Sequence, residues 1–225
     1  MDGIKETFGE IAGIYDRMNH ALSLGLDRRW RRKAVSSAGV SSPVRILDLA
    51  CGTGDMTLEL ARRFKGVPVE GVDITCQMLE IAKRKCSNEP FIAFTPGSAS
   101  NLPFQCGEAG LFSLVTCAWG FRNFPCKLQA LRESARVLQK EGKLVVLEFF
   151  RPGNALLGFL TDLWLRTASF LLAPRKRAAY AYLRNSIKIA LDWKSFVAMA
   201  EDAGFELESR RFFFPACTLL VFRKR

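Results

Sequence analysis

From position 44 onward, short apolar runs alternate with stretches that have the apolar spacing of amphipathic helices. The runs predict strands over 44–49, 67–72, 91–94, 111–118 and 143–149. Helical spacing over 53–64, 74–85 and 127–138 predicts a helix in each of those intervals. Strands joined by helices of this length build βαβ units, so we expect an α/β, doubly wound, mainly parallel sheet.

The pattern changes after Pro152. Residues 155–173 are apolar on nearly every side, which predicts a helix buried in the domain or at an interface. Two further helices are expected over 180–191 and 193–203. The runs 205–214 and 216–222, separated at Pro215, predict a C-terminal antiparallel hairpin, which brings the expected sheet to seven strands. Residues 1–43 look helical and then loop-like, and a Ser-Ser-Pro break precedes the first strand.

Composition sets the class of molecule. The chain has 225 residues, 49% hydrophobic and 24% charged, as expected for a globular domain and too apolar for a disordered chain. Its net charge is +11, of which +7 lies in residues 151–225. Such an excess suits an acidic partner, either nucleic acid or an anionic membrane surface, although a merely basic solvated surface is an equally good interpretation.

Cysteine and histidine usage argues against a metal centre. The seven cysteines are scattered without any Cys-x-x-Cys pair, and His20 is the single histidine, so we expect no metal site and a reducing, cytoplasmic environment. The N-terminus is polar, so no signal peptide is expected. Asp162 and Arg166 interrupt the apolar stretch 155–173, so we do not expect it to span a membrane.

A glycine loop joins the first predicted strand to the first helix, in the run Ile-Leu-Asp-Leu-Ala-Cys-Gly-Thr-Gly-Asp over 46–55. Gly52 and Gly54 allow a tight turn and close approach of a ligand at the carboxyl end of the sheet. A dinucleotide fingerprint would need a third glycine, and Asp55 would repel a pyrophosphate. S-adenosylmethionine has no phosphate and carries an ammonium and a sulfonium, which suit acidic neighbours such as Asp48 and Asp55.

The next two strands supply the rest of a nucleoside site. Asp73 ends the second strand, 19 residues after Gly54, and its carboxylate can accept both ribose hydroxyls. Met78 can pack on the adenine face, and Ser98 and Ala99 can line the adenine edge. Taken singly, these features fit an ordinary βα turn or a helix cap. In this order and spacing, they predict an S-adenosylmethionine site.

The motifs resemble those of the ubiquinone/menaquinone biosynthesis C-methyltransferases, which methylate a ring carbon of a prenylated quinol precursor. The resemblance extends over nearly the whole chain. Its more specific stretches are Tyr-Asp-Arg-Met-Asn at 15–19 and Gly-Phe-Arg-Asn at 120–123, whereas many methyltransferases share the glycine loop. The resemblance implies a class I, Rossmann-like fold forming one domain. In that domain, 1–43 would be a helical lid, 44–150 the cofactor-binding core, and 151–225 the substrate-side helices and hairpin.

By that resemblance, Thr53, Asp73, Ser98 and Ala99 fall at the family's cofactor contacts. Two positions depart from the usual pattern. Position 98 is commonly Asp or Asn in the family, and Ala-Trp-Gly at 118–120 replaces a common Ser-Phe-Gly. These departures bear on cofactor affinity and on the identity of the acceptor more than on the reaction class.

Carbon methylation needs an electron-rich ring carbon aligned with the methyl–sulfur bond in a dry pocket. Arg122, with Asn123 beside it, follows the fourth strand and could stabilise a quinolate oxyanion or orient a water as base; the alternative is a salt-bridged loop arginine. Tyr15, with its neighbours Asp16 and Asn19, could close over the cofactor or merely pack in an N-terminal helix. His20 is a weaker candidate base, and a structural role is expected for Glu148.

A prenylated quinol substrate would come from a membrane. The stretch 155–173 could touch the inner face of the bilayer near Arg175, Lys176 and Arg177, or could be buried in a homodimer. The rivals are methylation of another small molecule, methylation of RNA and a non-catalytic cofactor-binding subunit. We expect no nucleic acid partner, because the Asn/Asp-Pro-Pro-aromatic run of amino-group methyltransferases is absent. A pyrimidine carbon-5 methyltransferase needs a Pro-Cys nucleophile, and Pro125-Cys126 is instead expected to begin a helix. The choice between a naphthoquinol and a benzoquinol stays open.

Overall fold

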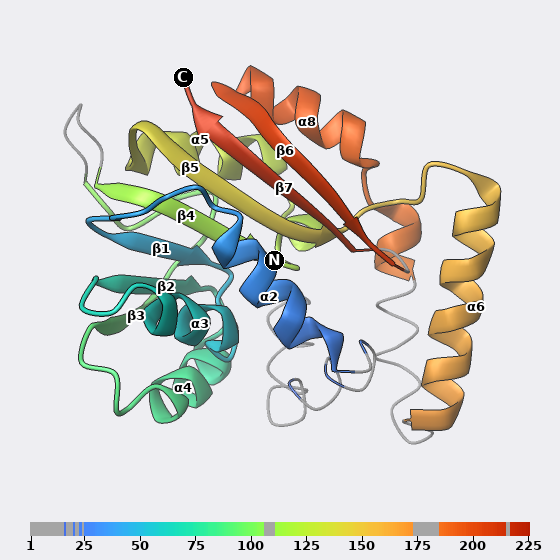
Figure 1. Ribbon diagram of the computed structural model, residues 1–225, viewed down its shortest axis with the longest axis horizontal. Coiled ribbons are helices and arrows are strands. Elements are labelled where there is room, and N and C mark those ends of the chain that lie inside the picture. Colours follow the sequence, from blue (N-terminus) through green and yellow to red (C-terminus); the bar gives the residue numbers. More distant parts are fainter. Residues whose placement is uncertain are drawn as a thin grey trace.

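A computed structural model describes residues 16, 20, 23, 25–105, 111–172, 185–214 and 217–225, without the side chains of 165 and 168–172. Seven strands form one sheet in the order β3-β2-β1-β4-β5-β7-β6 (Figure 1). The strands are β1 (Ile46–Leu49), β2 (Val69–Asp73), β3 (Ile92–Pro96), β4 (Phe112–Ala118), β5 (Leu138–Phe149), β6 (Phe205–Phe213) and β7 (Cys217–Lys224).

The first five strands are parallel, and the C-terminal hairpin adds two antiparallel ones. β1 pairs in parallel with both β2 and β4, while β5 pairs antiparallel with β7. The predicted mainly parallel sheet with a C-terminal antiparallel hairpin is therefore confirmed. Chain order reverses between β1 and β4, which is the position where open α/β sheets bind ligands.

Helices cover both faces of the sheet (Figure 1). On one face, α2 (Leu26–Ser36) contacts α3 (Asp55–Arg63) and β5, and α4 (Cys76–Lys85) lies against β2 and β3. On the other face, α5 (Lys127–Val137) contacts β5 and α8 (Trp193–Asp202). Because the side chains of a strand alternate between faces, Leu47 and Leu49 enter one core cluster and Ile46 enters the other. Asp48 consequently points toward α3.

Several element boundaries differ from the prediction for local reasons. α3 begins at Asp55 rather than at residue 53, because Gly54 has a φ of 84° and cannot lie within a right-handed helix. β1 begins at Ile46 rather than at 44, because the N–H of Val44 donates to the side-chain Oγ of Ser113 at 2.9 Å instead of to a backbone carbonyl of the neighbouring strand. β5 begins at Leu138, earlier than expected, and β2 extends to Asp73.

The helix α6 (Ala155–Leu172) stands to one side of the sheet (Figure 1). It was expected to be buried in the domain or to lie at an interface, and Leu156, Phe159 and Leu163 are exposed, so this side of the helix is not buried in the domain. No helix in the described part of the chain is long and apolar enough to cross a membrane. Residues 185–189 form the described end of the helix that was expected over 180–191.

Candidate functional site

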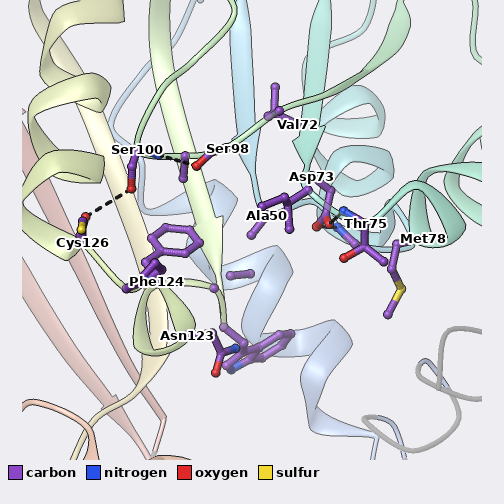
Figure 2. A pocket seen from close by; sticks show the side chains of 18 residues that line it. Ala50, Val72, Asp73, Thr75, Met78, Ser98, Ser100, Asn123, Phe124 and Cys126 are labelled. Atoms are coloured by element: carbon purple, nitrogen blue, oxygen red, sulfur yellow. Dashed lines mark hydrogen bonds between the residues drawn. The ribbon is translucent and has the colours of Figure 1, made fainter. Parts of the chain in front are cut away.

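A mainly apolar pocket lies at the carboxyl ends of β1, β2 and β4, beside the reversal of strand order. Its walls come from the glycine loop, from the start of α4, from the turn after β3 and from the turn after β4 (Figure 2). Its lining residues include Ala50, Gly52, Asp73, Met78, Ser98, Ala99, Ala118, Trp119, Asn123, Phe124 and Cys126. Five of the predicted cofactor residues therefore line one pocket, namely Gly52, Asp73, Met78, Ser98 and Ala99.

The glycine loop and the end of β2 are bonded to each other. The backbone N–H of Gly52 donates to Asp73 Oδ2 at 2.9 Å, and the N–H of Thr75 donates to Asp73 Oδ1 at 2.8 Å. Gly52 and Gly54 have φ values of 55° and 84°, a region that costs other residues backbone strain. At Gly54 a Cβ would also lie 3.1 Å from that of Ala82, so the loop depends on this glycine for packing as well.

Asp73 is a buried carboxylate that opens onto the pocket. Burial raises its pKa, while the backbone N–H groups of Thr75 and Gly52 act to lower it. A carboxylate has about four acceptor sites, so two vicinal hydroxyls could donate to Asp73 alongside or in place of the weaker of its present bonds. Figure 2 shows Asp73 beside Thr75 and Ala50, with Met78 farther along α4.

Ser98 and Ala99 line the same pocket from the turn after β3. This turn closes through an isolated bridge between Ser98 and Asn101, and Ser98 Oγ accepts a hydrogen bond from the N–H of Ser100 at 3.3 Å. Ser100 Oγ in turn donates to the carbonyl of Cys126 at 3.3 Å, which links this wall to the turn after β4 (Figure 2). The positions chosen for the adenine edge thus lie across the pocket from Asp73 and Met78.

Asp48 lies behind the glycine loop and does not line the main pocket. It accepts hydrogen bonds from Thr57 Oγ1 at 2.7 Å and from Thr116 Oγ1 at 2.8 Å. Burial raises its pKa to about 6, although the two threonine hydroxyls oppose the shift. Asp48 instead lines a smaller adjoining cavity together with Gly52, Thr53 and Trp119, and its contact with the cofactor stays a prediction.

Thr53 and Asp55 belong to an ion-pair network rather than to an open acidic surface. Lys85 Nζ donates to Asp16 at 2.6 Å, to Asp55 at 2.6 Å and to Thr53 Oγ1 at 3.2 Å. The Thr53 hydroxyl also donates to Asp16. Asp16, which was expected to help close the cofactor site, is thereby joined to the glycine loop. The expected role of Asp55 as a counter-charge for the cofactor is weakened, because the chain's own cations neutralise it.

Arg122 is held in a buried ion pair outside the main pocket lining. Its guanidinium donates to Glu148 Oε1 at 2.8 Å and to the carbonyl of Trp119 at 2.6 Å, and its side chain is 6% exposed. The N–H of Arg122 donates to Glu148 Oε2 at 3.0 Å. Glu148 has the structural role expected of it. This geometry favours the interpretation of Arg122 as a salt-bridged loop arginine over its interpretation as an oxyanion-binding residue.

Asn123 does line the pocket, from the 3₁₀ helix η1 (Phe121–Asn123) that follows β4. Figure 2 shows it near Phe124 and across from Asp73. His20 lies apart from this pocket and pairs with Asp27 at 3.0 Å, as suits its structural alternative. Tyr15 and Asn19 lie outside the described residues.

Sequence reasoning missed the residues that act through distant partners. Lys85, Thr57, Thr75 and Thr116 were not singled out, although each contacts a residue that was. Helical spacing in α3 could have pointed to Thr57, which lies on its buried side. No local signal identifies Lys85, because Asp16 is 69 positions away along the chain.

Cys51 on the glycine loop and Cys117 on β4 are buried. Burial raises the pKa of Cys51 and of Cys117 well above the ordinary range, so both thiols stay protonated. Cys126 lies at the pocket rim just before α5. Within the described ranges, no group of three His, Cys, Asp or Glu side chains is placed to hold a metal ion.

Comparisons with known proteins agree closely on one family. A model described as the ubiE/COQ5 methyltransferase family matches residues 2–214. A demethylmenaquinone methyltransferase of Deinococcus radiodurans is 38% identical, covering 99% of this chain and 92% of the relative. Another of that name, from Thermus thermophilus, is 42% identical over 89% and 91% of the two chains. A ubiquinone/menaquinone biosynthesis C-methyltransferase of Campylobacter jejuni is 35% identical over 98% and 97%.

Solved structures share the fold at low identity. A SAM-dependent methyltransferase of Aquifex aeolicus aligns with a TM-score of 0.66 at 14% identity, covering 87% of this chain and 89% of that one. The [4+2]-cyclase SpnF also aligns with a TM-score of 0.66, at 17% identity over 88% and 80% of the two chains. Since a cyclase shares it, the fold alone does not determine the reaction.

Proposed function

The chain belongs to the ubiE/COQ5 methyltransferase family, and we propose that it methylates a ring carbon of a prenylated quinol in respiratory quinone biosynthesis. It is an S-adenosylmethionine-dependent methyltransferase. The observation that carries the proposal is the buried Asp73 carboxylate, bonded to the glycine loop and open to a mainly apolar pocket. When bound, the cofactor supplies an electrophilic methyl group.

The residues present fit that cofactor. We assign the ribose hydroxyls to Asp73, the adenine to the space between Met78 and the Ser98–Ala99 turn, and the backbone approach to Gly52 and Gly54. Thr53 lines the smaller cavity behind the glycine loop rather than the main pocket. Absence of a third loop glycine and the buried negative charge of Asp73 suit a ligand without phosphates.

The acceptor ring belongs on the side of the pocket formed by Ala118, Trp119, Asn123 and Phe124. Aromatic walls exclude water and hold a planar ring, and the Asn123 amide can donate to or accept from a quinol oxygen. Arg122 acts as a positioning residue for this turn, because it bonds the carbonyl of Trp119 and the carboxylate of Glu148. We propose that Tyr15, in the predicted lid of residues 1–43, contacts the bound ligands. We also propose that residues 1–225 form a single domain.

A transfer assay tests the reaction. The full chain is incubated with methyl-deuterated S-adenosylmethionine and demethylmenaquinol, and the product is analysed by mass spectrometry and NMR for a labelled methyl on a ring carbon. We expect transfer to the reduced quinol and none to the oxidised quinone, whose ring is electron-poor. Cofactor binding without transfer to either demethylmenaquinol or a benzoquinol precursor would contradict the proposed acceptor and favour the other-small-molecule alternative.

We propose in addition that α6 contacts an anionic membrane from which the substrate is drawn. Leu156, Phe159, Leu160 and Leu163 are exposed at helical spacing and form one apolar stripe. Arg166 and Lys188 both pair with Asp162, which leaves this part of the surface cationic. Apolar side chains bordered by cations suit an anionic bilayer.

Vesicle sedimentation tests this contact. We expect binding to vesicles that contain phosphatidylglycerol, weaker binding to pure phosphatidylcholine, and loss of binding in Phe159→Asp. Phe91→Asp is the matched control, because Phe91 is also exposed but precedes β3. Unchanged vesicle binding in Phe159→Asp, or a concentration-dependent dimer that this change disrupts, would assign the stripe to another role.

A further inference from the structure

A second, smaller cavity adjoins the cofactor pocket on the far side of the glycine loop. The two share Ala50, Gly52, Ala118 and Trp119 as lining residues, so they lie on either side of the same segments of chain. The smaller cavity has a volume of about 30 Å³, room for about two water-sized groups. Three charged residues line it, namely Arg31, Asp48 and Asp55, whereas among the described residues Asp73 is the one charged residue that lines the main pocket.

That cation is Arg31, which α2 carries to the glycine loop. Its side chain is only 7% exposed. One guanidinium nitrogen, Nη1, lies 2.6 Å from Asp27 Oδ2, and the guanidinium carbon lies 4.7 Å from the centre of the Trp119 ring. Burial acts to raise the pKa of Asp27, but Arg31 and the hydrogen bonds from Ser23 and His20 outweigh it and keep that carboxyl ionised. The guanidinium of Arg31 is therefore held by Asp27 at one edge and by the Trp119 ring against one face.

The other edge of the guanidinium is held more loosely. Arg31 Nη2 lies 3.4 Å from Asp55 Oδ2, which is longer than the 2.7–2.9 Å of a good charge-assisted hydrogen bond. Asp55 has a closer partner in Lys85, at 2.6 Å from its other oxygen. Lys85 can keep Asp55 neutralised if Arg31 exchanges this weak ion pair for a pair with another carboxylate. A planar fork of this kind matches a carboxylate in bidentate fashion.

We propose that Arg31 binds the carboxylate of the cofactor's amino-acid end. The assignment rests on the proposed S-adenosylmethionine site and deepens it. With the ribose at Asp73, the amino-acid end of the nucleoside leads past Gly52 into the smaller cavity. In the described part of the chain, Arg31 is the only cation lining either cavity. Asp48, which lines the same cavity, supplies negative charge for the ammonium of the same zwitterion. Arg31 thus selects nucleosides that bear an α-amino acid.

Isothermal titration calorimetry with two nucleosides tests the assignment on the full chain. S-adenosylhomocysteine carries the carboxylate, whereas 5′-methylthioadenosine has the same nucleoside without the amino acid. In Arg31→Met we expect S-adenosylhomocysteine to bind at least about tenfold more weakly, the worth of one charge-assisted hydrogen bond. We expect the affinity for 5′-methylthioadenosine to change less than about twofold, which is below one such bond.

Two further variants separate recognition from folding. Arg31→Met removes the arginine partner of the buried Asp27, which keeps only its bonds to Ser23 and His20. The double variant Asp27→Asn with Arg31→Met removes both charges and should show the same selective loss. Arg32→Met, an exposed neighbour on α2, is the matched control and should bind both nucleosides like the wild type. Equal weakening of both nucleosides, or no weakening of S-adenosylhomocysteine, would overturn the assignment while leaving the cofactor site intact. Failure of both nucleosides to bind the wild type would instead contradict the proposed function, and this assignment with it.

Discussion

The carboxylate of Asp73 and the backbone N–H of Gly52 are hydrogen-bonded at 2.9 Å, which joins the end of β2 to the loop that follows β1. This single contact fixes the carboxylate at the edge of the loop where a nucleoside would lie. It also means that the glycine loop and the ribose-binding residue form one preorganised unit. Preorganisation lowers the ordering cost of binding, because the two walls of the site do not have to assemble around the ligand.

The buried carboxyl of Asp48 predicts a pH-dependent stability. Its folded-state pKa is about 6, above its ordinary value of 3.8, so the folded state holds the proton more tightly than the unfolded state does. Stability from this group is present below pH 4 and is lost as the pH rises through 6, by about 3 kcal/mol in total. We expect Asp48→Asn to abolish this loss, so that the variant gains stability relative to the wild type between pH 4 and 7.

Chemical denaturation at several pH values measures this difference. Thr57 and Thr116 keep hydrogen-bonding partners in Asp48→Asn, because an amide can both accept and donate. Asp192→Asn is a useful control, since the pKa of Asp192 is lowered by hydrogen bonds from Ser195 and the sign of its effect is opposite. A stability difference between Asp48→Asn and wild type that does not vary with pH would show that Asp48 is not the titrating group.

The ion pair between Arg122 and Glu148 predicts a large loss of stability when one partner is removed. Glu148 is 1% exposed, so Arg122→Met strands a buried carboxylate and should lower the free energy of unfolding by about 3–5 kcal/mol. Replacing both partners, in Arg122→Met with Glu148→Leu, should recover part of that loss. Urea denaturation provides the measurement.

The exposed pair of Arg166 and Asp162 serves as the comparison for Arg122. Arg166→Met should change the free energy of unfolding by less than about 1 kcal/mol, because solvent screens the pair. If Arg122→Met were as mild as Arg166→Met yet abolished methyl transfer, the guanidinium would have the direct catalytic role that its sequence position first suggested.

Two glycines with similar backbone angles should respond differently to alanine. Gly54 and Gly66 have φ values of 84° and 78°, so both substitutions carry a backbone cost of about 1 kcal/mol. Only at Gly54 would the new Cβ meet other atoms, at 3.1 Å from Ala82 Cβ and 3.3 Å from the Phe94 ring. We expect Gly54→Ala to lose at least about 1 kcal/mol more than Gly66→Ala in thermal or urea unfolding, as overpacking does. Equal losses would mean that the loop can shift freely.

The order and type of the elements followed from apolar periodicity, whereas their ends did not. Periodicity reports which residues face the core, and the core clusters contain the expected strand residues such as Leu47, Val72 and Val146. Helix ends depend on single backbone angles. The φ of Gly54 moved the start of α3 by two residues, and no hydrophobic pattern carries that information.

The candidate site was predictable where its residues lie at strand ends and obscure where they act through distant partners. Asp73 ends one strand, and Ser98 and Ala99 follow the next. In a parallel sheet the carboxyl ends of neighbouring strands lie at the same edge, so the predicted strand topology was enough to place these residues around one pocket. Strand alternation turns Asp48 toward Thr57 of α3, so it lines the smaller cavity and not the main pocket, a placement that its position in the sequence does not reveal. Arg31 and Lys85 reach the loop from helices on other parts of the chain, and only three-dimensional packing reveals their contacts.

The affinity for S-adenosylmethionine of wild type, Asp73→Asn and Glu70→Gln tests the central claim most directly. Glu70 lies on the same strand, where it bonds Thr95 and Arg45 rather than the pocket, so its variant reports any general disturbance of β2. By calorimetry we expect the wild type and Glu70→Gln to bind alike and Asp73→Asn to bind about 100-fold more weakly, the loss expected for two ribose hydrogen bonds to a carboxylate. An unchanged dissociation constant in Asp73→Asn, or no binding to the wild type, would contradict the account.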